Sequence, residues 1–378
     1  MRNLSSLLGQ CLLPLGAILL CLLMLACFAC SNPAPEIGPR QFNVGFAIYD
    51  FTYTNPEGDK EALTTAVWYP TAAEPSSYTY NNGLTSSVAF EAVPGMENGS
   101  YPLIIFNHGA YSSGIQSLAF TERLASEGFI VAAPDFIDTI PPDFVEQIAF
   151  ARIKGSAGVA DPPGVLKAVG DFMETMSADR DAFLSYLETF RLRKASFVID
   201  EMLELNQDSN SPFHNLIDEH AIGMARHSLG GLTTLGVIGA HPNKGMKDDR
   251  IKAAILLSQP VYPFEGNIDQ IDIPIMIMHG DHDLPAIRPK IQRWVAYGNA
   301  NPPKFYLVIR QCNHFTFGNT PCEDYDLIPQ CQSSVGQVQV IINYSSAFFR
   351  RYLKQDLEAE DQLQGSDTML VTYEREFQ

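Results

Sequence analysis

The sequence predicts an α/β protein in which helices flank a mostly parallel central sheet, and three observations support this. Short, fully apolar runs alternate with amphipathic helical stretches along most of the chain, as strands and crossover helices do. Hydrophobic residues make up 46% of the chain and charged residues 18%, a composition typical of a globular protein. The length of 378 residues is sufficient to bury a large core.

The N-terminal residues 1–30 resemble an export signal, because Arg2 precedes a long uncharged apolar run that ends in small residues. The endings at Cys27 and Cys30 resemble the box of bacterial lipoproteins, in which a Cys after a small residue is lipidated. Ordinary signal cleavage and an uncleaved membrane anchor are the two alternatives. All three predict an exported domain that is periplasmic, membrane-anchored or secreted. A tether that contains proline follows over residues 31–40.

The main domain is predicted over residues 41–355 and begins with a strand pair rich in β-branched and aromatic residues. A buried strand, a helix and another buried strand follow, and this order implies parallel strands joined by a crossover helix. The predicted ranges are strands 42–53 and 62–70, a loop over 71–87, strand 102–107, helix 117–128 and strand 128–134.

Residues 137–220 change to acidic amphipathic helices, which predicts a helical insertion before the next strand. The insertion either packs against the sheet or forms a lid over a site. Further strands and helices then alternate, and an acidic C-terminal tail is expected over residues 356–378. The strands are predicted at 221–225, 251–257, 273–280 and 304–310, and the helices at 229–241 and 337–354.

The chain is acidic, with 25 Lys and Arg against 43 Asp and Glu and a formal net charge of -18. Affinity for nucleic acid comes from Lys and Arg that neutralise phosphates, so no nucleic-acid partner is expected. The acidic residues are spread through the helices, which indicates a solvated surface.

Three cysteines lie near the C-terminus, at Cys312, Cys322 and Cys331. In an oxidising compartment two of the three are expected to pair, either Cys322 with Cys331 or Cys312 with Cys322. The spacing fits neither a redox motif nor a zinc site.

The segment IGMARHSLGG places Ser228 between a short apolar strand and a helix. This is the context of a nucleophile elbow, in which a tight turn exposes a serine hydroxyl at the mouth of a sheet. The amide of Leu229 is then the natural donor to an oxyanion, at the positive end of the helix. Alternatively, Ser228 is a simple helix cap, and Gly230 and Gly231 serve helix packing.

A catalytic serine needs a base and a group that orients the base. Asp283 and His314 each follow a predicted parallel strand, and such strand ends converge on one crevice. Asp283 is preferred over Asp281 because it lies further beyond its strand, where a loop can turn it toward His314. His227, beside Ser228, is expected to be a turn or packing residue.

His279 and His282 alternate with the two aspartates and raise the possibility of a metal site. No second cluster in the sequence completes a coordination sphere, so no metal is predicted.

The second oxyanion donor is expected from the segment HGAYSSG. Gly109 allows the following amide, that of Ala110, to point into the crevice. Tyr111 is the expected wall of a pocket for the acyl group of a substrate. In the alternative interpretation, His108 and Gly109 only end the strand.

The segments HGAYSS, AAPDF, FVIDEMLELN, MARHSLGG, MHGDHD and CNHF, in this order, resemble an α/β-hydrolase. The nearest group is that of platelet-activating-factor acetylhydrolase and dienelactone-hydrolase-like esterases, and the resemblance covers about residues 42 to 355. It implies Ser228 as nucleophile, His314 as base, Asp283 as its partner and the amides of Ala110 and Leu229 as oxyanion hole. It also implies hydrolysis of short acyl esters through an acyl-enzyme, without a cofactor.

One departure from the elbow pattern G-x-S-x-G is Arg226, which stands where the first glycine belongs. A long side chain there is expected to bend the turn or to escape to solvent, at a cost of about 1–3 kcal/mol. A second departure is Ser228 itself, because dienelactone hydrolases use Cys.

The sequence therefore predicts an exported serine carboxylic-ester hydrolase that acts on short-acyl or phospholipid-type esters through an acyl-enzyme. Its partners would be a small-molecule ester and, through lipidated Cys27 or Cys30 or an uncleaved N-terminal segment, a membrane. One alternative is a serine peptidase of the same fold. The other is a lipid- or ester-binding lipoprotein of this fold, catalytically impaired by Arg226.

Overall fold

Parallel strands form the centre of the sheet in the computed structural model, which describes residues 40–95, 99–136, 152–155, 171, 174, 178–284, 289–318 and 335–378. Within these ranges eleven strands form one sheet in the order β11-β10-β9-β8-β7-β5-β6-β2-β1-β4-β3. The strands are β1 (Asn43–Thr54), β2 (Lys60–Thr71), β3 (Ser76–Thr79), β4 (Thr85–Phe90), β5 (Tyr101–Asn107), β6 (Ile130–Pro134), β7 (Ile217–His227), β8 (Ile251–Leu257), β9 (Ile275–Gly280), β10 (Lys304–Ile309) and β11 (Leu370–Glu376).

The six central strands, from β6 through β5, β7, β8 and β9 to β10, are all parallel to one another. Every residue of β5, β6, β9 and β10 is buried. Strands covered on both faces need no polar alternation, which is why the sequence shows them as continuous apolar runs. The predicted α/β class with a mostly parallel sheet is confirmed.

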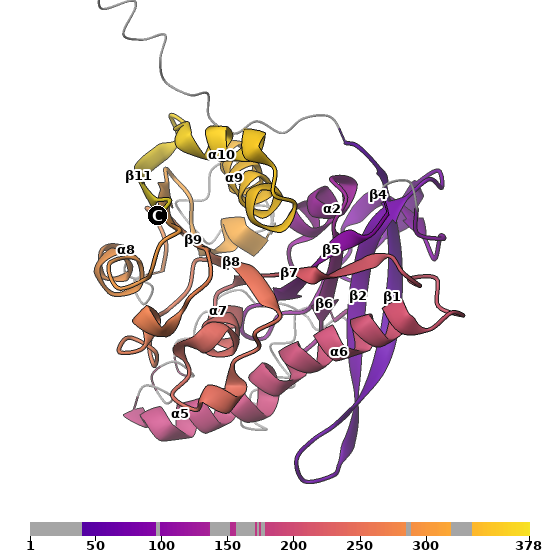
Figure 1. Cartoon of the computed structure of the whole chain (residues 1–378), viewed down its shortest axis with the longest axis horizontal. Helices are drawn as coiled ribbons and strands as arrows, with labels where there is room; N and C mark the ends of the chain where they lie inside the picture. Colours follow the sequence, from indigo (N-terminus) through magenta and orange to yellow (C-terminus); the bar gives the residue numbers. More distant parts are fainter. Residues whose placement is uncertain are drawn as a thin grey trace, which may run out of the picture.

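Helices cover both faces of the sheet (Figure 1). One face packs against α5 (Arg180–Leu187), α6 (Arg193–Gln207) and α7 (Gly230–Leu235), together with two π-helical segments, η2 (Glu188–Leu192) and η6 (Arg293–Tyr297). The other face packs against α2 (Leu118–Ser126), α9 (Val335–Leu353) and α10 (Leu357–Gln364). The remaining short helices are α8 (Pro289–Gln292), the π-helical η3 (Gly236–Ala240) and the 3₁₀ turns η4 (Lys244–Met246), η5 (Ile268–Gln270) and η7 (His314–Gly318).

The predicted helical insertion is only partly described. Its second half runs as one continuous helix from α5 through η2 into α6, and α6 contacts β1, β5, β6 and β7. This part packs against the sheet, whereas most of residues 137–177 lies outside the described residues.

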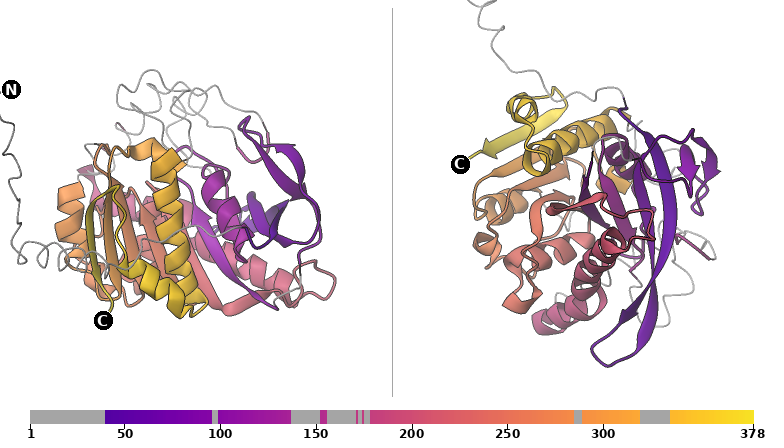
Figure 2. Two further views of the ribbon diagram at one scale, coloured as in Figure 1. Left: turned by 90° about the horizontal axis from the view of Figure 1, so that it is seen from above. Right: turned by 45° about the vertical axis from the view of Figure 1, so that its right-hand side comes forward.

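Two segments expected to lack regular structure are ordered in the sheet, so these predictions are wrong. The expected loop 71–87 contains the β3–β4 hairpin, in which the Tyr78 and Tyr80 rings pack on Phe46. The expected tail 356–378 forms α10 and then β11, which pairs antiparallel with β10 at the sheet edge (Figure 2). β11 is difficult to recognise as a strand in the sequence, because its charged residues lie between apolar residues that pack against the core.

The N-terminal predictions lie outside the described residues, since the structure describes nothing before Arg40. They concern the export signal, the tether, Cys27 and Cys30. In the described ranges, no helix is both long enough and apolar enough to cross a bilayer.

Cys312 is buried and is a free thiol, which contradicts its predicted pairing with Cys322. The alternative pairing of Cys322 with Cys331 falls outside the described residues.

Candidate active site

Ser228 lies in a tight turn between the end of β7 and the start of α7. Its φ of +53° is rare for a residue with a side chain. The Ser228 amide donates to the Leu257 carbonyl at 3.1 Å, and the Ser228 carbonyl accepts from the Gly231 amide at 2.8 Å. Gly230 allows the close approach of α7, because a Cβ there would lie 2.2 Å from the Asn107 carbonyl oxygen. This is the geometry of a nucleophile elbow.

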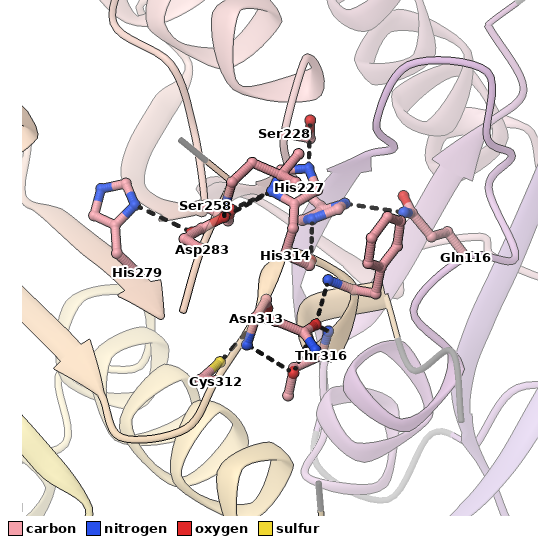
Figure 3. A network of polar contacts seen from close by, with 12 residues as sticks. Gln116, His227, Ser228, Ser258, His279, Asp283, Cys312, Asn313, His314 and Thr316 are labelled. Atoms are coloured by element: carbon pink, nitrogen blue, oxygen red, sulfur yellow. Dashed lines mark hydrogen bonds and ion pairs between the residues drawn. The ribbon is translucent and has the colours of Figure 1, made fainter. Parts of the chain in front are cut away.

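His314 connects Ser228 with Asp283 (Figure 3). Its Nε2 lies 3.0 Å from Ser228 Oγ, and its Nδ1 lies 2.9 Å from Asp283 Oδ1. A carboxylate can only accept, so Nδ1 carries the proton and Nε2 is free to accept from the serine hydroxyl. The structure thus brings together three residues that the sequence places after β7, β9 and β10.

Asp283 is held as a carboxylate, with no exposed side-chain surface. Burial alone would raise its pKa, but the imidazoles of His279 and His314 outweigh burial and hold the pKa below its ordinary value. The Leu284 amide donates to Oδ1 at 2.8 Å. Asp281 is exposed and does not take part in this arrangement, in agreement with the preference for Asp283.

Ser258 is a member of this cluster that the sequence did not indicate. Its hydroxyl donates to Asp283 Oδ2 at 2.6 Å and also lies 2.6 Å from His314 Nδ1. It follows β8 with a φ of +50°, a conformation stabilised by a bond from its amide to the Met278 carbonyl at 2.8 Å. No motif marks this position, and only its place after a central strand could have identified it.

The two expected oxyanion donors lie on either side of the elbow. Leu229 directly precedes α7, and Ala110 follows β5 in a turn. In the described part of the chain, neither of these two amides donates to a protein acceptor. Both are therefore available to a ligand. Tyr111 is half-buried beside Ala110 and packs against the hydrophobic cluster, while its role as a pocket wall stays a prediction.

Arg191 and His108 fix the peptide that carries the Ala110 amide. Arg191 Nη2 donates to the Gly109 carbonyl at 3.2 Å, and Nη1 donates to the His108 carbonyl at 2.8 Å. His108 Nε2 accepts from the Phe136 amide at 2.9 Å, so its Nδ1 donates to the Gly109 carbonyl at 2.7 Å. In a trans peptide the N–H points away from the C=O, so these bonds direct the Ala110 amide to the opposite side.

Arg226 neither bends the turn nor reaches solvent, contrary to the expectation from sequence. It is fully buried, and its guanidinium lies over Gly231, where a Cβ would come within 1.5 Å of Nη1. Within the described ranges its three side-chain nitrogens have no hydrogen-bond partner, and burial lowers the pKa of the guanidinium. The elbow pattern has a glycine at position 226 and therefore needs no room for a side chain there. In this chain the room for the Arg226 side chain comes from Gly231, which has no side chain.

His279 is buried with its Nδ1 3.7 Å from Asp283 Oδ2, too far for a hydrogen bond. Burial lowers the pKa of the His279 imidazole. Among the described residues, no group of three or more His, Cys, Asp or Glu side chains is arranged to hold a metal ion.

Comparison with known proteins gives two findings. Residues 82–155 match the family model Chlorophyllase. The structure resembles a ferulic acid esterase from Streptomyces cinnamoneus with a TM-score of 0.57 and 18% sequence identity, over 90% of this chain and 96% of that chain. No curated protein matches the sequence. The structural match shows that this chain has the α/β-hydrolase fold of that esterase, and within this fold Ser228, His314 and Asp283 come together.

Proposed function

We propose that this chain is an exported serine esterase that cleaves short-acyl or phospholipid-type esters through an acyl-enzyme on Ser228. The observation that carries the proposal is the chain of contacts from Ser228 Oγ to His314 Nε2 at 3.0 Å and from His314 Nδ1 to Asp283 Oδ1 at 2.9 Å. Such a chain allows a neutral imidazole to take the serine proton while a buried carboxylate stabilises the imidazolium that forms.

In the first half of the reaction, Ser228 Oγ attacks the ester carbonyl carbon and its proton passes to His314 Nε2. The carbonyl oxygen, which now carries a negative charge, accepts hydrogen bonds from the amides of Ala110 and Leu229. The tetrahedral intermediate then expels the alcohol, which takes the proton from His314. In the second half, water gives a proton to His314 and attacks the acyl-Ser228 carbonyl; the tetrahedral intermediate then expels Ser228 Oγ, which takes the proton back from His314 as the acid leaves.

The substrate class rests on resemblance and on relatives. The motifs resemble the platelet-activating-factor acetylhydrolase and dienelactone-hydrolase-like group, and a solved structure with a similar fold is a ferulic acid esterase. The acyl length and the alcohol are the parts of the proposal that hydrolysis of an ester series tests directly.

Export rests on the apolar segment 1–30, with membrane attachment through lipidated Cys27 or Cys30, or through an uncleaved segment, as part of the proposal. Metabolic labelling with a radioactive fatty acid tests lipidation, with Cys27→Ala and Cys30→Ala showing which residue carries the label. Unlabelled protein of shortened mass would indicate ordinary signal cleavage, and unlabelled protein of full mass an anchor.

The experiment that tests catalysis is hydrolysis of p-nitrophenyl esters from acetate to long acyl chains, with Ser228→Ala and His314→Ala as paired variants. The expected result is hydrolysis that prefers short chains and disappears in both variants. Labelling by a fluorophosphonate should likewise require Ser228 and His314. A folded wild-type protein that neither hydrolyses any ester nor accepts the label would refute the proposal and favour a binding protein.

A further inference from the structure

We propose that Gln116 and His227 form a positioning bridge that holds the Ala110 oxyanion donor and the His314 base in one fixed geometry. The inference rests on the proposed function, because it assigns these two residues to the same site. It adds a connection between two segments that follow different strands.

The bridge begins at the oxyanion turn. Gln116 Oε1 accepts from the Gly109 amide at 2.9 Å, and Gln116 Nε2 donates to His227 Nδ1 at 2.9 Å. His227 Nε2 then donates to the backbone carbonyl of His314 at 2.9 Å. Hydrogen bonds therefore run without interruption from the residue before Ala110 to the backbone of the base. Figure 3 shows the part that joins Gln116, His227 and His314.

Only one arrangement of protons satisfies every partner in the bridge. The Gly109 amide can only donate and the His314 carbonyl can only accept. The amide oxygen of Gln116 must therefore face Gly109, and His227 must be the tautomer with its proton on Nε2. Burial lowers the pKa of His227, which keeps the ring neutral as this arrangement requires.

Packing supports the same connection beside the hydrogen bonds. The Ser117 hydroxyl donates to the Phe317 carbonyl at 3.0 Å. A Cβ on Gly318 would lie 3.1 Å from Gln116 Nε2, so the Gln116 amide packs against the last residue of η7. The His227 ring lies 4.6 Å from the His314 ring, measured between centroids. The segment that carries the oxyanion donor is thus attached to the turn that begins with His314.

This attachment matters because a transition state needs both groups at once. The oxyanion donor and the base act on atoms of one tetrahedral intermediate, so a change in their separation weakens one interaction or the other. Within the described part of the chain, the side chains of Gln116 and His227 form no hydrogen bond with Ser228 Oγ or with the ring nitrogens of His314. They act through the positions of Gly109 and the His314 backbone, as positioning residues.

The test measures kcat and KM for p-nitrophenyl acetate in the full chain, with active sites counted by fluorophosphonate titration. Gln116→Met removes both bonds at similar volume, and His227→Phe keeps the ring and removes its nitrogens. Each variant should lower kcat per titrated site about 10-fold with KM unchanged. The double variant should be no slower than either single variant, because both changes break one series of bonds.

Two controls separate positioning from simple loss of structure. Gln116→Glu keeps an acceptor for Gly109 and can share one proton with His227, so it should restore kcat to within about 3-fold of wild type. Gln339→Met removes an exposed glutamine that bonds Asn343 in α9, and it should leave kcat unchanged. Additive losses in the double variant, or a loss of titratable sites with unchanged kcat per site, would overturn the proposal.

A measurement that does not depend on enzyme activity tests the bridge even if the proposed function is wrong. ¹⁵N NMR of the histidine rings, with His227 assigned through His227→Phe, should show a protonated Nε2 and an unprotonated Nδ1 that accepts a hydrogen bond. Gln116→Met should shift the Nδ1 resonance toward that of a free acceptor. A protonated Nδ1 in the wild type would refute the bridge, whereas a wild type with the expected tautomer and no esterase activity would refute only the proposed function.

Discussion

The hydroxyl of Ser258 lies 2.6 Å from Oδ2 of Asp283, the carboxylate oxygen that His314 does not use. Ser258 therefore satisfies the second oxygen of a buried carboxylate that would otherwise have lost part of its hydration without compensation. The carboxylate is fixed from both sides, with His314 on one oxygen and Ser258 on the other.

Ser258→Ala should lower kcat about 10-fold with little change in KM, because the Asp283 carboxylate would lose a donor and some of its orientation. The measurement is steady-state hydrolysis of p-nitrophenyl acetate. Ser345→Ala is the matched control, since Ser345 is equally buried in α9 and its hydroxyl has no partner among the described residues. Equal activity of both variants and wild type would show that Ser258 does not support the carboxylate.

Asp283→Asn should lower kcat by roughly 10⁴-fold, because an amide in place of the carboxylate leaves His314 in the wrong tautomer. Asp281→Asn should leave kcat within about 2-fold of wild type, since the Asp281 side chain is exposed. The pair is compared by kcat at one pH on the same ester. A larger loss in Asp281→Asn than in Asp283→Asn would reverse the assignment.

Gly231→Ala should lower the free energy of unfolding by about 1–3 kcal/mol, because the new methyl group would displace the buried guanidinium of Arg226. The same substitution in an Arg226→Gly background should cost less, because the guanidinium is gone, although Gln259 Cβ, at 2.7 Å, still obstructs the new methyl group. Urea denaturation of the four proteins of this cycle measures the difference. Equal costs in the two backgrounds would mean that Arg226 has another position when Gly231 is replaced.

The raised pKa of Asp135 predicts that the free energy of unfolding depends on pH. Its two oxygens accept from the Gly114 and Ile153 amides at 2.6 and 2.8 Å, yet burial raises its pKa from 3.8 to about 6. The folded state therefore binds the proton more tightly than the unfolded state. The contribution to stability is fully present below about pH 4 and is lost as the pH rises through about 6.

Wild type should lose about 3 kcal/mol of unfolding free energy relative to Asp135→Asn between pH 4 and pH 7.5. Denaturant unfolding of both proteins at the two pH values measures this, with the exposed Asp249→Asn as control. A constant difference between wild type and Asp135→Asn at both pH values would contradict the raised pKa.

The triad could be predicted from sequence because the parallel arrangement of the strands brings its three residues together. Parallel strands place their carboxyl ends at one edge, so Ser228, Asp283 and His314 converge because β7, β9 and β10 lie close together in the sheet, with only β8 between β7 and β9. Each of the three also follows a run of mainly apolar residues, at 221–225, 273–280 and 304–310, which marks the strand ends in the sequence. The expected helices and central strands agree with the structure for the same reason.

The supporting residues could not be predicted, because nothing in the sequence connects them. Gln116 and His227 are 111 positions apart, and their contact depends on how the turn after β5 folds over the elbow. Ser258 is a single serine after an apolar strand, a common pattern. The expectation that Arg226 bends the turn or reaches solvent is wrong because the elbow pattern does not show where the side chain finds room. That room comes from Gly231.

The edge strands could not be predicted from the sequence for a different reason. β11 carries Glu374, Arg375 and Glu376, and a half-exposed edge strand with this many charges resembles a solvated tail. Arg293 pairs with Glu374, so the charges of β11 are part of how it is attached.

The contact between Arg226 and Gly231 also constrains the order in which such a pair can arise in evolution. An arginine at position 226 can take the position it has here only when position 231 has no side chain, so the order with the glycine first avoids an overlap of the two side chains. Once the arginine is present, a substitution at position 231 that was harmless before becomes costly. The two positions are therefore coupled, and a substitution at either one changes which residues the other can accept.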